Sequence, residues 1–248
     1  MKIVLQKFIA QAGYCSRRKA EELIKKGAGL ENGPILVNGR PPELGEKVDE
    51  NDDVRIDGKK IFLSNDKIYI MLNKPAGYTC TNRKFPGEKN VFELLRTFTC
   101  SQSSPNKGER LFIVGRLDKN SRGLILLTND GNLTLKLTHP RYEHEKEYEI
   151  KLKIQMSNVK TIIEKLKFGV NIEEDDGTVR VKDAKYLEGN KFKIILTEGK
   201  KRQIRRMFTA IGCQVTDIIR TRIGNLKLND LPEGQWLFLS AEEIKNLK

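Results

Sequence analysis

The sequence predicts an α+β protein, in which a small N-terminal module precedes a larger domain built on a mostly antiparallel sheet flanked by helices. Two observations lead to this class. The first sixty residues place two short helical patterns ahead of short strands and turns. Beyond residue 68, long segments of β type mix with separated helices and lack the strict strand and helix alternation of a doubly wound parallel sheet. A chain of 248 residues is long enough to bury one good core and a second small one.

The N-terminal module is expected to begin with two helices. Apolar residues recur at helical spacing from Val4 to Ala12 and stop at Gly13, which suits a C-terminal cap. Ser16 then stands at an N-cap position ahead of a second helix over Arg17–Lys26, whose apolar side chains share one face. The opposite face carries five cations: Arg17, Arg18, Lys19, Lys25 and Lys26.

Short strands and turns complete this module. The segments Ile35–Val37 and Val54–Ile56 are predicted strands. Each runs into a dipeptide that is typical of hairpins, Asn38-Gly39 after the first and Asp57-Gly58 after the second. The module is therefore expected to be a compact unit with one basic helix.

The boundary between the two domains is predicted near Ser64-Asn65-Asp66. A new apolar run, Ile68–Leu72, starts just after this polar segment and ends at Asn73-Lys74-Pro75. The predicted domains are therefore residues 1–63 and residues 67–248.

The second domain is predicted to alternate irregularly between strands and helices. Between them, the Ser-, Pro- and Gly-containing stretch Cys100–Arg110 is expected to be a mobile loop. The predicted strands are Ile68–Leu72, Leu111–Val114, Leu124–Thr128, Glu147–Ile154, Val179–Leu187, Lys191–Thr197, Gln214–Arg220 and Gln235–Leu239. The predicted helices are Val91–Thr97, Asn132–Thr138, Ser157–Leu166 and Arg202–Ile211.

The charge balance indicates a polyanionic partner. The chain has 46 Lys and Arg against 33 Asp and Glu, which gives a formal net charge of +13 and a sequence pI near 9.5. Each Lys or Arg placed against a phosphate releases a counterion, which favours a nucleic acid, although a solvated basic surface has the same composition. The apolar runs, such as Leu124–Leu127, are far shorter than a bilayer span. We therefore expect a soluble protein with no membrane partner.

The cysteines and histidines do not predict a disulfide framework or a metal centre. The cysteines lie far apart with no CxxC pair, and only two histidines could add ligands. We expect the ordinary thiols of a reducing cytosol, a cytoplasmic location and no bound metal. The residues concerned are Cys15, Cys80, Cys100, Cys213, His139 and His144.

One segment, Gly115–Gly131, could carry chemistry. Its Asp118 lies in a predicted loop between two apolar strands, flanked by cations and glycines. An aspartate there can act as an electrostatic or covalent group while it stays ionised, and a nearby cation favours this by lowering its pKa from about 3.9. From spacing alone, a turn aspartate paired with a surface arginine is the commoner explanation.

A second segment, Glu198–Phe208, is rich in cations. On a helix, its buried stripe would be formed by Ile204, Met207, Phe208 and Ile211. The cations that lie off this stripe are Arg202, Arg205 and Arg206. Such a cluster could bind phosphates or send one guanidinium to a buried carboxylate, and a solvated basic face is the alternative.

Several separated signatures in this chain resemble one family. They are GRLDKNSRGLILLTNDG at 115–131, EKEY at 145–148, EGKKRQIRRM at 198–207 and RTRIGNLKL at 220–228. In this order they resemble the ribosomal-RNA pseudouridine synthases of the RsuA/RluB/RluF type. The opening LQKFIAQAGYCSRRKAEELIKKG, at 5–27, resembles the S4 RNA-binding domain that those enzymes carry. The residues Lys119–Gly131 and the RTRI run at 220–223 resemble most closely the RluF-like branch, which acts on large-subunit rRNA.

The resemblance implies an isomerase that converts uridine to pseudouridine in ribosomal RNA, here 23S rRNA. Residues 1–63 would be the S4-like RNA-binding domain and residues 67–248 the pseudouridine synthase catalytic domain. The family's catalytic aspartate falls on Asp118, and its active-site tyrosine, which contacts the target base and is a candidate for proton transfer, falls on Tyr148. The basic residue that pairs with the aspartate falls on Arg205. Its guanidinium would oppose the rise in the pKa of Asp118 that a desolvated pocket causes.

The resemblance also implies the partners. The loop that holds the extruded nucleotide corresponds to Arg116 and Gly123, and the basic helix of the S4-like domain would bind RNA phosphates. The expected RNA-binding set is Arg17, Arg18, Lys19, Arg116, Gly123, Arg202 and Arg206. The partner is ribosomal RNA, with ribosome-assembly intermediates and tRNA as open alternatives. No cofactor and no metal is expected, and the default oligomeric state is a monomer.

Two other classes of function remain open from the residues. One is a non-catalytic RNA-binding or ribosome-assembly protein with the same fold, and the other is a DNA-binding module. The chemical step also stays open, because Asp118 could attack C1′, add to C6 of the base or assist a glycal-type elimination.

Overall fold

The structure is a computed structural model that describes residues 2–27, 29–30, 33–63, 66–83, 85–95, 111–153, 158–172 and 176–247. The chain divides into two compact units. The first comprises residues 1–68 with 98–112 and 129–131, and the second comprises 69–97, 113–128 and 132–248. The domain bounds 1–63 and 67–248 remain predictions. The expected mobile loop Cys100–Arg110 lies outside the described residues, as do residues 64 and 65 of the predicted junction.

The first unit begins with the two predicted helices, α1 (Leu5–Gln11) and α2 (Arg17–Gly27). Gly13 follows α1 with a φ of +81°, a left-handed conformation that glycine adopts without a Cβ penalty. The Oγ of Ser16 accepts the backbone N–H of Lys19 at 3.2 Å, as an N-cap does. Both predicted caps are therefore confirmed.

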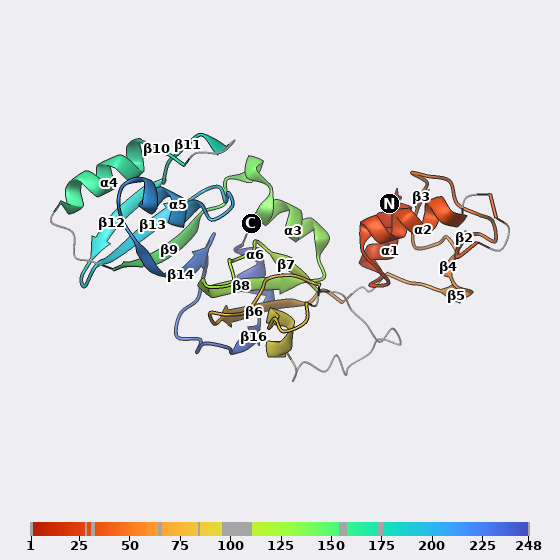
Figure 1. Ribbon diagram of the computed structural model, residues 1–248. Helices are drawn as coiled ribbons and strands as arrows, with labels where there is room; N and C mark the ends of the chain where they lie inside the picture. Colours follow the sequence, from red (N-terminus) through yellow and green to blue (C-terminus); the bar gives the residue numbers. More distant parts are fainter. Residues whose placement is uncertain are drawn as a thin grey trace. The chain divides into compact units, whose positions relative to one another are not determined.

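Short strands pack against these helices (Figure 1). The hairpin dipeptide Asp57-Gly58 has positive φ at both residues and joins two of the strands. The strands are β1 (Ile3–Val4), β2 (Ile35–Val37), β3 (Lys47–Val48), β4 (Val54–Ile56) and β5 (Lys59–Lys60), paired as β1-β3 and β2-β4-β5. The core of this unit is formed by Leu5, Phe8, Ile9, Ala20, Ile24, Ile35, Val37, Val48, Val54, Ile56 and Ile61.

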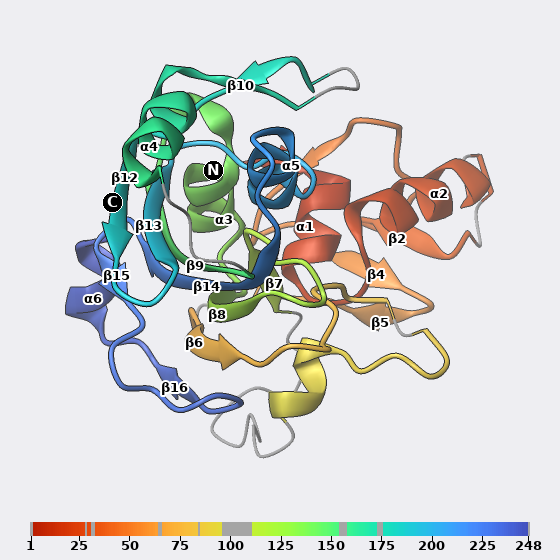
Figure 2. The ribbon, with the colours of Figure 1, turned by 60° about the vertical axis from the view of Figure 1, so that its left-hand side comes forward.

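The second unit is built on one large sheet. Its main strand order is β12-β13-β9-β14-β8-β6-β16, with β15 paired to β14 and β7 paired to β8. Along the main strand order, and between β14 and β15, the pairings are antiparallel except that of β14 with β8, which confirms the mostly antiparallel sheet. Figure 2 shows β13, β9, β14 and β8 side by side. The bounds are β6 (Tyr69–Lys74), β7 (Phe112–Val114), β8 (Arg122–Thr128), β9 (Lys146–Leu152), β12 (Asp183–Leu187), β13 (Lys191–Leu196), β14 (Val215–Ile223), β15 (Leu226–Lys227) and β16 (Trp236–Phe238).

Helices and a small hairpin accompany this sheet. The ring centroids of Phe208 on α5 and Phe192 on β13 are 5.9 Å apart in an edge arrangement, so aromatic packing fixes α5 against the sheet. The elements are η1 (Val91–Leu95), α3 (Gly131–Thr138), η2 (Pro140–Tyr142), α4 (Val159–Phe168), β10 (Val170–Asn171), β11 (Thr178–Val179), α5 (Gln203–Ala210) and α6 (Ala241–Lys245).

Two predicted elements differ from the structure. The predicted strand Val179–Leu187 is divided between β11 and β12, because the N–H of Val181 donates to the carbonyl of Leu166 at the end of α4 and so leaves the sheet. The predicted helix Val91–Thr97 is the 3-10 helix η1, and its first N–H donates to the carbonyl of Thr79 at 3.1 Å. Residues 96 and 97 lie outside the described range.

Other expectations concern thiols, metals and membranes. Cys15, Cys80 and Cys213 are not joined in disulfides, and Cys100 lies outside the described residues. Within the described ranges, no three His, Cys, Asp or Glu side chains gather as a metal-binding group. The helices of the described part are all too short or too polar to cross a bilayer.

Candidate active site

A cavity of about 530 Å³ in the second unit brings together all three expected catalytic residues. Asp118 comes from the turn before β8, Tyr148 from β9 and Arg205 from the first turn of α5. Arg116 and Arg202, two members of the expected RNA-binding set, line the same cavity. Segments more than eighty residues apart therefore meet at one hollow, whose volume lies in the range of small-molecule sites, roughly 300–1,000 Å³.

The loop that carries Asp118 is held by the buried cation Lys74, at the end of β6. The Nζ of Lys74 donates to the carbonyls of Ser121 at 2.6 Å and of Lys119 at 3.0 Å. A third bond, of 3.0 Å, goes to the carbonyl of Pro75. Burial lowers the pKa of Lys74, and the negative charge of Asp118 acts in the opposite direction. Lys74 therefore fixes the backbone just after Asp118 and supplies positive charge beside it.

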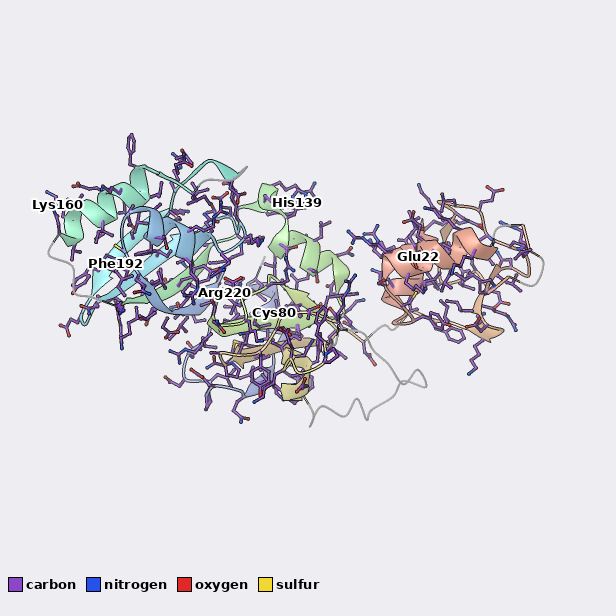
Figure 3. The ribbon with its side chains drawn as sticks, in the orientation of Figure 1. Glu22, Cys80, His139, Lys160, Phe192 and Arg220 are labelled. Carbon is purple, nitrogen blue, oxygen red and sulfur yellow. The ribbon has the colours of Figure 1, made fainter. Side chains whose placement is uncertain are left out.

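A second buried cation, Arg220 on β14, holds the same loop from its other side. Its side chain is 1% exposed, its Nε donates to the carbonyl of Leu124 at 2.8 Å, and its Nη2 donates to the carbonyl of Gly115 at 2.8 Å. Figure 3 labels Arg220 and Cys80 in the interior of the second unit. The charge of Arg220 acts on Lys74 and on Cys80, which places these groups close together. Both ends of the loop around Asp118 are thus tied to buried cations.

Gly123 has a structural position that the sequence did not indicate. It lies in β8 rather than in the loop, and it is the Cα partner of Arg220 where β8 meets β14. A Cβ added to Gly123 would lie 2.3 Å from the carbonyl oxygen of Arg220, and the φ of Gly123 is +106°. Gly123 does not line the cavity. In this structure it permits the close approach of two strands.

Tyr148 combines a buried ring with an accessible hydroxyl. The residue is 7% exposed, and its Cα partners across the sheet are Ile194 and Arg220. Among the described residues, its hydroxyl makes no hydrogen bond, and the residue lines the cavity. A flat ring with a polar tip at this place suits stacking on a base.

The N-terminus of α5 is fixed by Gln203, which is 3% exposed. Its Oε1 accepts the backbone N–H of Lys200 at 2.9 Å, and its Nε2 donates to Glu198 at 2.9 Å. The predicted buried stripe is confirmed for Ile204, Met207 and Phe208. This arrangement holds the preceding basic loop, and with it Arg202, at the edge of the cavity.

The expected ion pair between Asp118 and Arg205 is not present in this structure. Nη1 of Arg205 donates instead to the carbonyl of Val215 at 3.2 Å, and the described side chains show no ion pair between the two residues. Asp118 is exposed rather than enclosed in a dry cavity. The physical reason is that the cavity is open at Asp118, so solvent reaches the carboxylate.

The other members of the expected RNA-binding set lie in different environments. Arg206 is engaged within the protein, because its guanidinium donates to the carboxylate of Asp176 at 2.5 Å and to the carbonyl of Ile172 at 2.6 Å. Arg17, Arg18 and Lys19 are exposed on α2 of the first unit. Lys19 lies 3.3 Å from Glu22, whereas neither arginine has an ion pair with a described residue.

Sequence analysis gave no role to Lys74 or Arg220. A signal was present in each case, since a charged residue ends or interrupts a strongly apolar strand. The pattern alone could not show which backbone carbonyls these cations would meet.

Comparison with known proteins matches these two units to two families. Residues 68–210 match the family described as RNA pseudouridylate synthase, and residues 5–54 match the S4 domain. The chain belongs to the RNA pseudouridylate synthase family. It is therefore an isomerase that converts uridine in RNA to pseudouridine, and it carries an S4 RNA-binding domain at its N-terminal end.

Relatives of this family match nearly the whole chain. The large-subunit pseudouridine synthase B of Bacillus subtilis is 37% identical and covers 98% of this chain and 95% of its own length. A dual-specificity RNA pseudouridine synthase RluF of Salmonella typhi is 36% identical over 98% of this chain and 78% of its own length. A crystal structure of a pseudouridylate synthase, 24% identical, superposes with a TM-score of 0.67 over 99% of this chain and 100% of its own, which confirms the fold. Both branches match almost equally, so the RluF-like assignment stays a prediction.

Proposed function

We propose that this pseudouridine synthase modifies a specific uridine of large-subunit, 23S rRNA, with Asp118 as its catalytic carboxylate. The observation that carries the proposal is the meeting of Asp118, Tyr148 and Arg205 at one open cavity of about 530 Å³. The names of the relatives supply the class of RNA, because several are large-subunit enzymes. The buried cations Lys74 and Arg220 support the assignment of Asp118, since they fix the loop that presents it.

The reaction needs a carboxylate and a shaped pocket rather than an added reagent. The N1–C1′ glycosidic bond breaks, the base turns, and a C5–C1′ bond forms, while a proton leaves C5 and another is gained at N1. Atoms and oxidation state balance, so we propose that no redox partner, cofactor or metal takes part. Attack of Asp118 at C1′, addition at C6 and the glycal route all use the ionised carboxylate close to the bound nucleotide.

The other two residues act on the nucleotide that enters the pocket. We assign Tyr148 to stacking on the target base, with its hydroxyl available for proton transfer. Arg205 would turn toward Asp118 once the nucleotide closes the cavity and excludes water, because an ion pair strengthens as the surrounding dielectric falls. The target must leave its base stack first, which costs a few kcal/mol that RNA contacts elsewhere have to offset. The exposed cations of α2 and Arg116 are proposed to provide part of this binding.

The test uses the purified protein with 23S and 16S rRNA transcripts, which contain no modified bases. We expect the protein to form pseudouridine at a defined position of the 23S transcript, detected by carbodiimide tagging and by mass-shift analysis. Asp118→Asn removes the charge and nearly keeps the shape, so it should bind RNA but reduce product formation by at least about a thousandfold, as loss of a reacting group does.

The same experiment separates the alternatives. A non-catalytic binder would show no difference between wild type and Asp118→Asn, and modification of only the 16S transcript would contradict the proposed substrate. A salt-dependent competition between structured rRNA and duplex DNA addresses the third class, since preference for the duplex would favour a DNA-binding module.

We further propose a cytoplasmic monomer. The expected reacting groups Asp118, Tyr148 and Arg205 all come from one chain. Light scattering coupled to size-exclusion chromatography checks the mass against 28.4 kDa. Addition of tRNA to the assay determines whether tRNA is also a substrate.

A further inference from the structure

A second hollow of about 590 Å³ lies beside α5 in the second unit. One wall is the outward face of α5 and the other is the end of β10 with the residue that follows it. Its lining residues are Asn171, Ile172, Lys201, Arg202, Arg205, Arg206, Thr209 and Ala210. Among the described lining residues four are cations and none is a carboxylate, and one of the cations, Arg206, is paired with Asp176. The other three cations favour an anion in this hollow.

This second hollow adjoins the active-site cavity. Lys201, Arg202 and Arg205 line both. A ligand that fills the active-site cavity and extends past these three cations therefore enters the second hollow. A single base and its sugar fit within the first cavity, whereas a polynucleotide continues from that sugar through phosphodiester groups.

The cations of the second hollow have different roles. Arg206 is engaged by Asp176 and by the carbonyl of Ile172, which ties the segment after β10 to α5 and forms the wall. Lys201 and Arg202 are exposed, and neither side chain has a hydrogen bond or an ion pair to a described residue. Two cations are therefore available to a ligand at the boundary between the hollows.

Backbone geometry at this boundary also favours an anion. Arg202 is the N-cap residue of α5 with a φ of +52°, a conformation that non-glycine residues rarely adopt. Its side chain does not cap the helix. The positive end of the α5 dipole is thus directed toward the same place as the two available cations.

We propose that the second hollow binds the sugar-phosphate backbone of the nucleotides next to the target uridine. The proposal rests on the proposed function, because it supposes that the uridine occupies the active-site cavity. Lys201 and Arg202 would bind the flanking phosphates, and Thr209, which lines this hollow, would lie near the next one. Binding on one side of the flipped nucleotide would hold the strand in its distorted form and help to offset the cost of base flipping.

The test changes the second hollow without touching the active-site cavity. Thr209 is exposed and lines only the second hollow. Thr209→Glu places a negative charge there, and Thr209→Gln is the neutral control of nearly the same size. In 50 mM salt we expect Thr209→Glu to weaken binding of the 23S transcript at least tenfold and Thr209→Gln to change it less than about twofold. The difference should shrink at 500 mM salt, because added ions screen the repulsion.

A second measurement locates the phosphate. A synthetic hairpin around the modified uridine carries one uncharged methylphosphonate at a time, with a matching all-phosphate hairpin of the same sugars as control. In the wild type, a methylphosphonate at one or two linkages beside the uridine should weaken binding about tenfold. In Thr209→Glu the same change should weaken binding much less, because the glutamate charge already opposes binding of a phosphate there. A Lys201→Ala variant should lower the salt slope of binding by about one.

Several outcomes would overturn the inference. The inference fails if Thr209→Glu binds the 23S transcript as tightly as the wild type at low salt, or if the Glu and Gln variants lose affinity equally. It also fails if each methylphosphonate weakens binding equally in the wild type and in Thr209→Glu. Failure of the proposed function looks different. In that case the wild type forms no pseudouridine in the 23S transcript, while the coupling between Thr209 and the phosphates can still be measured by binding to the hairpin.

Discussion

At the scale of single residues, two buried cations that the active-site cavity does not expose determine where Asp118 lies. Lys74 donates to backbone carbonyls on the C-terminal side of Asp118, and Arg220 donates to carbonyls at both ends of the loop. A loop would otherwise sample many conformations, and fixing each residue costs roughly 1–2 kcal/mol of entropy. Charge-assisted bonds to the backbone offset that cost before substrate arrives, so the carboxylate is positioned in advance.

The variant Lys74→Met tests this arrangement. Methionine fills a similar volume but leaves the carbonyl of Ser121 without its Lys74 donor, and it leaves the carbonyl of Lys119 with the N–H of Gly77 as its remaining donor. We expect the free energy of unfolding to fall by about 3 kcal/mol, and kcat to fall more than KM rises. Urea denaturation and the pseudouridine assay measure the two effects. Lys67→Met, at an exposed position, is the control. Equal unfolding free energies and equal activities of the two variants would contradict a role for Lys74.

At the scale of elements, the junction of β8 with β14 connects the catalytic loop to the centre of the sheet. This parallel pairing lies within an otherwise antiparallel sheet, with Gly123 opposite Arg220. The close approach places the Arg220 side chain beneath the loop, where it meets Gly115 and Leu124. The position of the cavity wall formed by α5 does not depend on this junction. It is fixed by the packing of Phe208 on Phe192 and by the hydrogen bonds of Gln203.

Substitution of Gly123 by alanine should disrupt this junction. The added Cβ would meet the Arg220 backbone at 2.3 Å, and alanine is strained at a φ of +106°. We expect a loss of about 3 kcal/mol or more in the free energy of unfolding, with activity falling together with the folded fraction. Gly199→Ala is the control, because a Cβ there has no neighbour within 4 Å and the φ of Gly199 is not in the left-handed region. Thermal unfolding of both variants gives the comparison, and an unchanged melting temperature for Gly123→Ala would exclude the clash.

At the scale of the whole molecule, the two units have separate hydrophobic cores. The core of the first unit is formed only by residues between Leu5 and Ile61. One core of the second unit is formed by Met71, Val114, Leu124, Leu126, Leu133, Leu137, Ile223, Leu226, Leu228, Leu239 and Leu247. Separate cores allow binding and catalysis to be divided between two parts of one chain.

Removal of residues 1–63 should therefore weaken RNA binding and leave the catalytic domain folded. We expect the remaining fragment, 64–248, to unfold cooperatively and to bind the 23S transcript at least tenfold more weakly, with a smaller salt slope, because the cations of α2 are lost. Circular dichroism checks that the fragment is folded, and a salt titration of RNA binding checks the loss of affinity and the smaller salt slope. In the full chain, Arg17→Glu with Arg18→Glu should reproduce much of the binding loss, and full affinity in the fragment would refute the assignment.

The sequence by itself determined most of the longer elements, the class of sheet, the caps of the first helices and the family. These follow from local periodicity, turn dipeptides and motifs that are readable within a few residues, and Ser16, Gly13 and the α5 stripe were found in this way. Only the tertiary structure decided what meets across the fold. The anchoring of the Asp118 loop by Lys74 and Arg220, the strand position of Gly123, the engagement of Arg206 and the missing ion pair of Arg205 all depend on contacts between residues distant in the chain. A linear pattern does not encode such contacts, because packing of the sheet and α5 sets which charged groups come within bonding distance.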